Sequence, residues 1–166
     1  MVKTLYMLIG PKGSGKTYIG TLIGQRTAIR FLPVEPIWLA LQPEEDGWQT
    51  VAALIDDLFV QYDNVMIESL GAGEPFQQFY ANLAQRYVIK MIRVQTELDT
   101  CRERVRNRNR AHHIPVPEEQ VAAYNKIAAA VEYDWAAEID NNGPATEEAI
   151  LAVIRRLLLG VSSFSP

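Results

Sequence analysis

Short apolar runs alternate along the whole chain with segments whose apolar residues recur at helical spacing. Continuous apolar runs of about four to eight residues are typical of strands buried on both faces of a sheet. They predict strands at residues 3–9, 30–34, 64–68, 87–94 and 136–140. Apolar residues three and four positions apart predict helices at 16–27, 48–62, 75–83, 96–110, 118–131 and 146–159. This alternation predicts an α/β fold in which helices cover both faces of a parallel sheet.

Two of these element ends carry a specific local signal. The second strand is expected to stop at Glu35-Pro36, because proline has no amide hydrogen for the next sheet hydrogen bond. Thr96 and Asp99 have the spacing of a capping box, in which side chains satisfy the first amides of a helix. We therefore expect Glu35 at the end of a strand and Thr96 at the start of a helix.

Length and composition indicate a single domain over residues 1–166. Hydrophobic residues make up 48% and charged residues 22%, values that exclude a disordered or low-complexity chain. The net charge of −4 does not favour nucleic acid as a partner. No apolar run approaches the roughly 20 residues that span a bilayer, so we expect no membrane partner. The single cysteine, Cys101, cannot form an intramolecular disulfide, which favours a reducing cytoplasm.

Residues 10–17 fit every fixed position of the phosphate-binding loop G-x-x-x-x-G-K-[ST], between the first predicted strand and the first predicted helix. Glycines let successive backbone amides turn toward phosphate oxygens, and the helix N-terminus adds its dipole. Lys16 would contact the β- and γ-phosphates of a nucleotide, and Thr17 would offer its hydroxyl to Mg²⁺. The predicted phosphate-binding residues are Gly10, Lys12, Gly13, Ser14, Gly15, Lys16 and Thr17.

Two carboxylates, Glu35 and Glu68, each follow a predicted strand. In open parallel sheets ligands bind beyond the carboxyl ends of the strands, so both are expected to face the crevice that holds the phosphate loop. We predict that Glu68 holds Mg²⁺ and that Glu35 accepts a proton from an attacking hydroxyl. The alternatives are that Glu68 is the base, or that either residue is an ordinary surface acid.

Arginine occupies every second position from 102 to 110, which gives this segment a local charge of about +4. An isolated stretch of this kind would be a solvated basic helix. Beside a phosphate loop, the planar guanidinium suits phosphoryl oxygens and can stabilise transition-state charge. On a helix that buries Leu98, Cys101 and Val105, the pair Arg104 and Arg108 lies on one side of the buried stripe. We predict a catalytic role for this pair, with Arg102 and Arg106 on the other side.

Together these features resemble the small phosphate-loop kinases of the nucleoside- and nucleotide-kinase-like group. The resemblance covers the loop at 10–17, the carboxylate after the second strand, an arginine-rich lid at about 102–117 and the turn Ile-Asp-Asn-Asn-Gly at 139–143. It implies a three-layer P-loop NTPase fold with a five-stranded parallel sheet and a lid that closes over ATP. It also implies that Arg108 and Asn142 contact the bound ATP, with Asn142 near the adenine.

Two subfamilies compete in this resemblance. Residues 114–119 and the turn at 139–143 are similar to polynucleotide-kinase-like and zeta-toxin-like enzymes, although these usually carry aspartate where Glu35 stands. Residues 96–110 and Trp38 are similar to deoxynucleoside kinases, although the arginine expected after Glu68 is absent. The implied function is transfer of the γ-phosphate of Mg-ATP to a hydroxyl or phosphate of a small, nucleoside- or nucleotide-like acceptor. The alternatives are a polynucleotide 5′-end kinase-like enzyme and a non-catalytic ATP-binding protein.

Overall fold

A computed structural model describes residues 1–108 and 116–160 of the chain. Its centre is a sheet of five parallel strands, as the sequence predicts, and their order is β2-β3-β1-β4-β5. Consecutive strands are not always neighbours, so the chain crosses the sheet between them. The strands are β1 (Thr4–Ile9), β2 (Arg30–Phe31), β3 (Asn64–Ser69), β4 (Val88–Gln95) and β5 (Trp135–Asp140).

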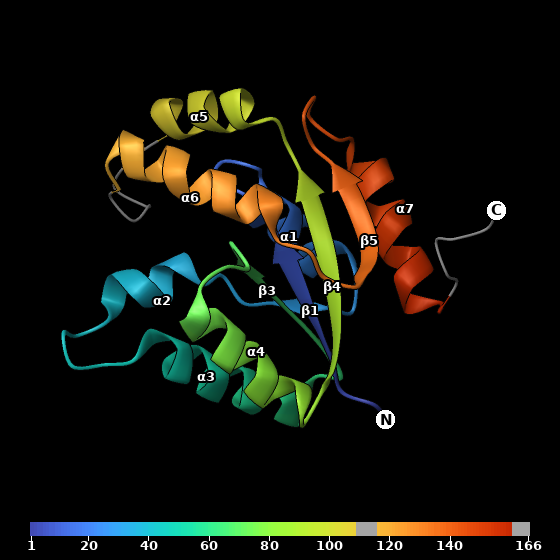
Figure 1. Ribbon diagram of the computed structural model, residues 1–166. Helices are drawn as coiled ribbons and strands as arrows, with labels where there is room; N and C mark the ends of the chain where they lie inside the picture. Colours follow the sequence, from blue (N-terminus) through green and yellow to red (C-terminus); the bar gives the residue numbers. More distant parts are fainter. Residues whose placement is uncertain (109–115, 161–166) are drawn as a thin grey trace.

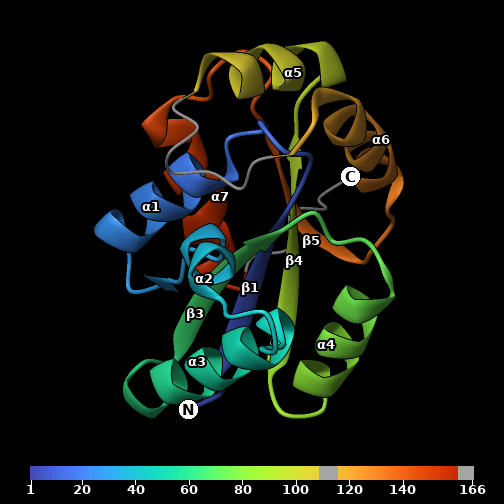
Figure 2. The same ribbon diagram turned by 90° about the vertical axis from the view of Figure 1, so that its left-hand side faces the viewer.

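Helices cover both faces of this sheet, which confirms the three-layer α/β fold. α1 packs with α7 on one face and α3 with α4 on the other (Figures 1 and 2). α5 and α6 pack together beyond the carboxyl ends of β1 and β4, toward which the arrowheads of these strands point in Figure 1. The helices are α1 (Lys16–Arg26), α2 (Glu35–Ala40), α3 (Gly47–Gln61), α4 (Glu74–Ala84), α5 (Leu98–Asn107), α6 (Glu118–Ala130) and α7 (Glu147–Leu158). No helix in the described ranges is long and apolar enough to cross a membrane.

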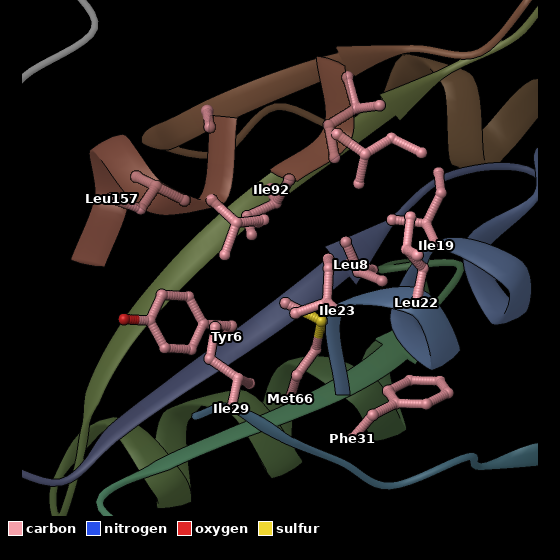
Figure 3. Packing of buried hydrophobic residues seen from close by; sticks show 14 of the residues in the cluster. Tyr6, Leu8, Ile19, Leu22, Ile23, Ile29, Phe31, Met66, Ile92 and Leu157 are labelled. Carbon is pink, nitrogen blue, oxygen red and sulfur yellow. The ribbon is translucent and has the colours of Figure 1, made fainter. Parts of the chain in front are cut away.

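The central strand β1 is buried along its whole length because it has a helix layer on each side. Tyr6 and Leu8 belong to the core cluster that includes Ile19 and Ile23 of α1. Figure 3 shows these side chains packed together with Met66 of β3. Leu5, Met7 and Ile9, at the alternate positions of β1, join the second cluster beneath α3 and α4. This two-sided burial explains why β1 is an uninterrupted apolar run.

The prediction of a second strand over residues 30–34 is wrong beyond Phe31, although the amide of Leu32 still donates to the carbonyl of Met66 at 2.8 Å. Glu35 opens the short helix α2 and does not end a strand. The physical reason lies in Pro36, which fits the first turn of a helix as well as the end of a strand, since neither position needs its amide hydrogen.

The prediction for α5 also needs correction at both ends. The capping box is absent, and the hydroxyl of Thr96 donates instead to the carbonyl of Ser14 at 3.2 Å. The helix ends at Asn107, and Arg108 has extended backbone angles, while residues 109–115 of the predicted lid lie outside the described residues. Cys101 is fully buried, but Leu98 and Val105 are only partly buried because α5 packs over the phosphate loop at the end of the sheet.

Candidate active site

The phosphate loop connects β1 to α1 and requires glycine at two positions by its backbone geometry. Gly13 has φ +88° and Gly15 has φ +96°, values that favour glycine. A Cβ atom at Gly13 would lie 2.4 Å from the carbonyl oxygen of Cys101, and one at Gly15 would lie 2.3 Å from Nδ2 of Asn141. The loop is therefore packed against α5 and against the turn that follows β5.

Side chains distant in sequence hold the carbonyl groups of this loop. Asn125 of α6 accepts from the amide of Lys12 at 2.8 Å and donates to its carbonyl at 3.0 Å. Asn141 donates through Nδ2 to the carbonyl of Ser14 at 2.8 Å. The first amides of α1 have no intrahelical acceptor, which suits them to phosphate oxygens. The surrounding structure thus fixes the loop in the form that an anion needs.

Lys16 lies at the start of α1 with its ammonium folded back over the loop. Its Nζ donates to the carbonyls of Gly10 at 2.7 Å and Pro11 at 2.8 Å. Burial lowers the pKa of Lys16 from 10.5 to about 8, and the negative charge of Glu68 partly opposes this shift. The ammonium is poorly solvated in the free protein, and a phosphate group placed beside it would favour its charged form.

Thr17 and Glu68 form an oxygen pair beside the loop. The hydroxyl of Thr17 donates to Oε2 of Glu68 at 2.7 Å. Glu68 is 5% exposed, and its Oε1 atom has no hydrogen-bond partner in the described part of the chain. Burial raises the pKa of this carboxyl, while the neighbouring Lys16 lowers it. A buried carboxylate oxygen without a partner beside a hydroxyl fits Mg²⁺, which takes one or two protein oxygens and otherwise water and phosphate oxygens.

A cavity of about 430 Å³ lies over the phosphate loop and extends toward α2 and α3. It brings together most of the residues that the sequence singles out, including both predicted carboxylates and both predicted arginines. The lining residues are Lys12, Gly13, Gly15, Lys16, Thr17, Tyr18, Val34, Glu35, Trp38, Trp48, Glu68, Ser69, Leu70, Ala72, Arg104 and Arg108. One side of this cavity is charged and another is aromatic and aliphatic.

Glu35 lies in the electrostatic field of two cations in this cavity. Burial lowers the pKa of Lys12, and the charge of Glu35 opposes that shift. Burial also lowers the pKa of Arg108, and Glu35 again opposes it. Glu35, at the N-terminal turn of α2, therefore adds a negative charge to a cavity that also holds Lys12 and Arg108.

The arginines of α5 divide into two groups with different contacts. Arg104 donates to the carbonyls of Gly13 at 3.4 Å and Asn141 at 2.8 Å, so it joins the loop to the turn after β5. Arg102 and Arg106 instead form ion pairs with Glu118 of α6. Arg104 and Arg108 line the cavity, and their catalytic roles stay predictions.

Asn142 does not line this cavity. Its side-chain oxygen accepts from the amide of Glu97 at 3.0 Å and from the hydroxyl of Thr100 at 3.2 Å. It borders a second cavity of about 360 Å³ that also includes Gly10. The predicted contact of Asn142 with the nucleotide stays a prediction.

Sequence reasoning missed two buried asparagines that hold the loop from outside, Asn125 and Asn141. Asn125 is 3% exposed and stands between Val121 and Ala128 on the buried stripe of α6. A polar residue at such a position signals a buried hydrogen-bond partner. Asn141 is the first residue after β5, and its carbonyl and side chain both make long-range contacts. It lies in the turn at 139–143 that the sequence analysis singles out, but that turn gave no sign that Asn141 contacts the phosphate loop.

No protein-family model matches the sequence, and no curated protein matches it. Among solved structures, the chain is similar to a putative kinase from Chloroflexus aurantiacus, with TM-score 0.68, 14% identity and coverage of 94% of this chain and 98% of that chain. It is also similar to the tunicamycin resistance protein of Deinococcus radiodurans (TM-score 0.67, 15% identity, 99% of both chains). A third similar structure is shikimate kinase from Acinetobacter baumannii (TM-score 0.61, 19% identity, 99% of this chain and 97% of that chain). At these identities the likeness concerns the fold, and the chain has the fold of the small phosphate-loop kinases.

Proposed function

We propose that this protein is an ATP-dependent kinase that transfers the γ-phosphate of Mg-ATP to a hydroxyl group of a small molecule. The observation that carries the proposal is that one cavity joins a complete phosphate loop to Glu35, Glu68 and Arg108. A protein that only binds nucleotide would not require a carboxylate and an arginine on the acceptor side of the loop. The presence of two named kinases among the three similar structures supports the same reaction class.

Each cavity residue has a role that follows from its position. The loop amides and Lys16 would bind the β- and γ-phosphates. Thr17 and Glu68 would hold Mg²⁺, which when bound neutralises charge on the phosphate oxygens. Arg108, at the end of α5, would contact the transferring phosphoryl group.

We further propose the cytoplasm as the location, because Cys101 is a free thiol.

The transfer itself is a displacement at phosphorus. The acceptor oxygen forms a bond to the γ-phosphorus, and the bond between this phosphorus and the oxygen bridging to the β-phosphate breaks. The acceptor hydroxyl loses its proton to the carboxylate of Glu35, and ADP leaves with the bridging oxygen. Glu68 is less suited as the base, because a carboxylate that holds a cation loses basicity.

Glu35→Gln tests this assignment, because the amide keeps the shape of the side chain but cannot accept the proton. We expect phosphate transfer to fall by roughly 10²–10⁴, the usual contribution of a general base. ATP affinity measured by calorimetry should stay within about threefold of wild type, because in this mechanism Glu35 contacts the acceptor. Glu44→Gln, an exposed change outside the cavity, is the matched control and should leave both values unchanged.

Two outcomes would contradict the assignment. Loss of ATP binding in Glu35→Gln would make Glu35 a metal ligand and leave Glu68 as the candidate base. ATP binding without transfer to any acceptor, in a screen with labelled ATP against nucleosides, nucleotides, sugars, aromatic alcohols and short oligonucleotides, would indicate a non-catalytic ATP-binding protein.

A further inference from the structure

The cavity over the phosphate loop is lined by two chemically different sets of side chains. In the first set the charged groups act on one another: Lys16 on Glu68, and Glu35 on Lys12 and Arg108. The second set comes from α2, α3 and the segments that follow β2 and β3. Its members are the apolar side chains of Val34, Trp38, Trp48, Leu70 and Ala72, which we call the apolar wall.

Packing against α4 and Gly47 holds two residues of the apolar wall, Trp48 and Trp38, in place. The ring of Trp48 lies 4.5 Å from that of Phe79 and 5.5 Å from that of Phe76, both in α4. The ring of Trp38 meets Trp48 edge-on at 5.2 Å and 86°. Trp38 also lies directly over Gly47, where an added Cβ would come within 1.6 Å of the indole. Only glycine at position 47 leaves Trp38 where it is.

We propose that the acceptor is an uncharged molecule that carries both the reacting hydroxyl and a flat, apolar ring, and that Trp38 and Trp48 determine this specificity. The proposal rests on the kinase function and narrows its substrate class. Aromatic side chains in this wall would stabilise a bound ring, because they bury its apolar surface and make ring-to-ring contacts with it. A charged or many-hydroxyl acceptor would place polar groups against Trp38, Trp48 and Leu70, whose side chains carry no charge and offer no polar group other than the indole N–H.

The experiment measures acceptor binding by calorimetry without nucleotide, so that it does not depend on phosphate transfer. Three probes separate the effect of a flat ring from the effects of added charge and of many hydroxyl groups. The first is 2-(2-naphthyl)ethanol, the second is the same alcohol with a carboxylate at the far end of the ring system, and the third is glucose. We expect the naphthyl alcohol to bind at least tenfold more tightly than either of the others, which corresponds to about 1.4 kcal/mol.

Three variants locate the binding. Trp38→Leu removes the ring and keeps an apolar side chain, and Gly47→Ala displaces the indole of Trp38 from outside the cavity. Each should weaken binding of the naphthyl alcohol at least tenfold. Trp135→Phe is the matched control, because Trp135 does not line this cavity, and it should leave binding within twofold. A melting curve for each variant checks the fold, and Trp38→Leu decides the matter if Gly47→Ala does not fold.

The outcomes separate this inference from the kinase function. Equal or tighter binding of the carboxylated alcohol or of glucose would overturn it, as would unchanged binding in Trp38→Leu or no binding of the naphthyl alcohol at millimolar concentration. Ring-selective binding without transfer from ATP would reject the kinase function and leave the apolar acceptor site standing. Transfer of phosphate to glucose, without tighter binding of the naphthyl alcohol, would reject the apolar acceptor site and leave the kinase function standing.

Discussion

Nucleotide binding should be linked to proton uptake through Lys16. In the free protein burial lowers the pKa of this ammonium from 10.5 to about 8. About half of the molecules then carry a charged Lys16 at pH 8 and about a tenth at pH 9. Phosphate oxygens beside Nζ would restore a pKa near the ordinary value, so ATP binding should take up about 0.9 protons at pH 9 and about 0.5 at pH 8. The full shift corresponds to at most about 3 kcal/mol, since the cavity opens to solvent.

Calorimetry in two buffers of different ionisation enthalpy measures this uptake directly. With ATP supplied as its Mg²⁺ complex, the apparent binding enthalpy should change strongly with the buffer at pH 9 and only slightly at pH 7, where about nine-tenths of Lys16 is already charged. The apparent dissociation constant of ATP should rise nearly tenfold per pH unit above about pH 8. Lys16→Arg is the matched control, because guanidinium stays protonated throughout this range.

Two results would refute this reasoning. ATP binding at pH 9 without proton uptake would mean that Lys16 is already charged in the free protein. Equal uptake in wild type and in Lys16→Arg would assign the proton to another group, and Lys12, whose pKa burial also lowers, is the first candidate. Without nucleotide, the unfolded chain binds more protons at Lys16 between about pH 8 and 10.5, so this residue should make the free energy of unfolding rise with pH across that window.

Three further predictions concern the support of the loop and the arginines. Asn125→Leu removes both hydrogen bonds to the backbone of Lys12, so we expect the free energy of unfolding to fall by about 2 kcal/mol. In calorimetry the melting temperature should fall by about 4–8 °C, and ATP binding should weaken. An unchanged melting temperature would show that these two hydrogen bonds add no stability. Arg108→Lys should lower turnover at least tenfold with ATP affinity nearly constant, because an ammonium cannot reproduce the bidentate contact. Arg106→Lys is its matched control, and equal losses in both variants would contradict a special role for Arg108. Arg104→Lys should in addition lower the melting temperature, because Arg104 bonds three backbone carbonyls.

The sequence predicts the sheet and the phosphate loop because both depend on local pattern. A strand buried on both faces must be apolar throughout, as β1 is, and the loop needs glycine where φ is positive, as at Gly13 and Gly15. The prediction that Glu35 ends a strand is wrong for a local reason, because Pro36 is equally compatible with the end of a strand and the first turn of a helix.

Other parts of the site are not encoded locally at all. Asn125 stands out as a buried polar residue in α6, but nothing near it in sequence indicates that its partner is Lys12. Helical spacing separates Arg104 and Arg108 from Arg102 and Arg106, but the partners of each arginine follow from where α5 and α6 pack. Trp38 of α2 and Trp48 of α3 come into contact only in the folded chain, where Trp38 packs over Gly47 at the start of α3.

The clamp on the phosphate loop has a consequence for the order of synthesis. The motif at residues 10–17 leaves the ribosome first, but its carbonyls are held by residues that are 113 and 127 positions later in the chain. A nascent chain that ends before Asn125 carries the whole motif, but it lacks both asparagines that hold the backbone of Lys12 and Ser14. Nucleotide should therefore stabilise only a nascent chain that extends past Asn141, and translation of residues 125–141, rather than of the motif, completes the nucleotide site.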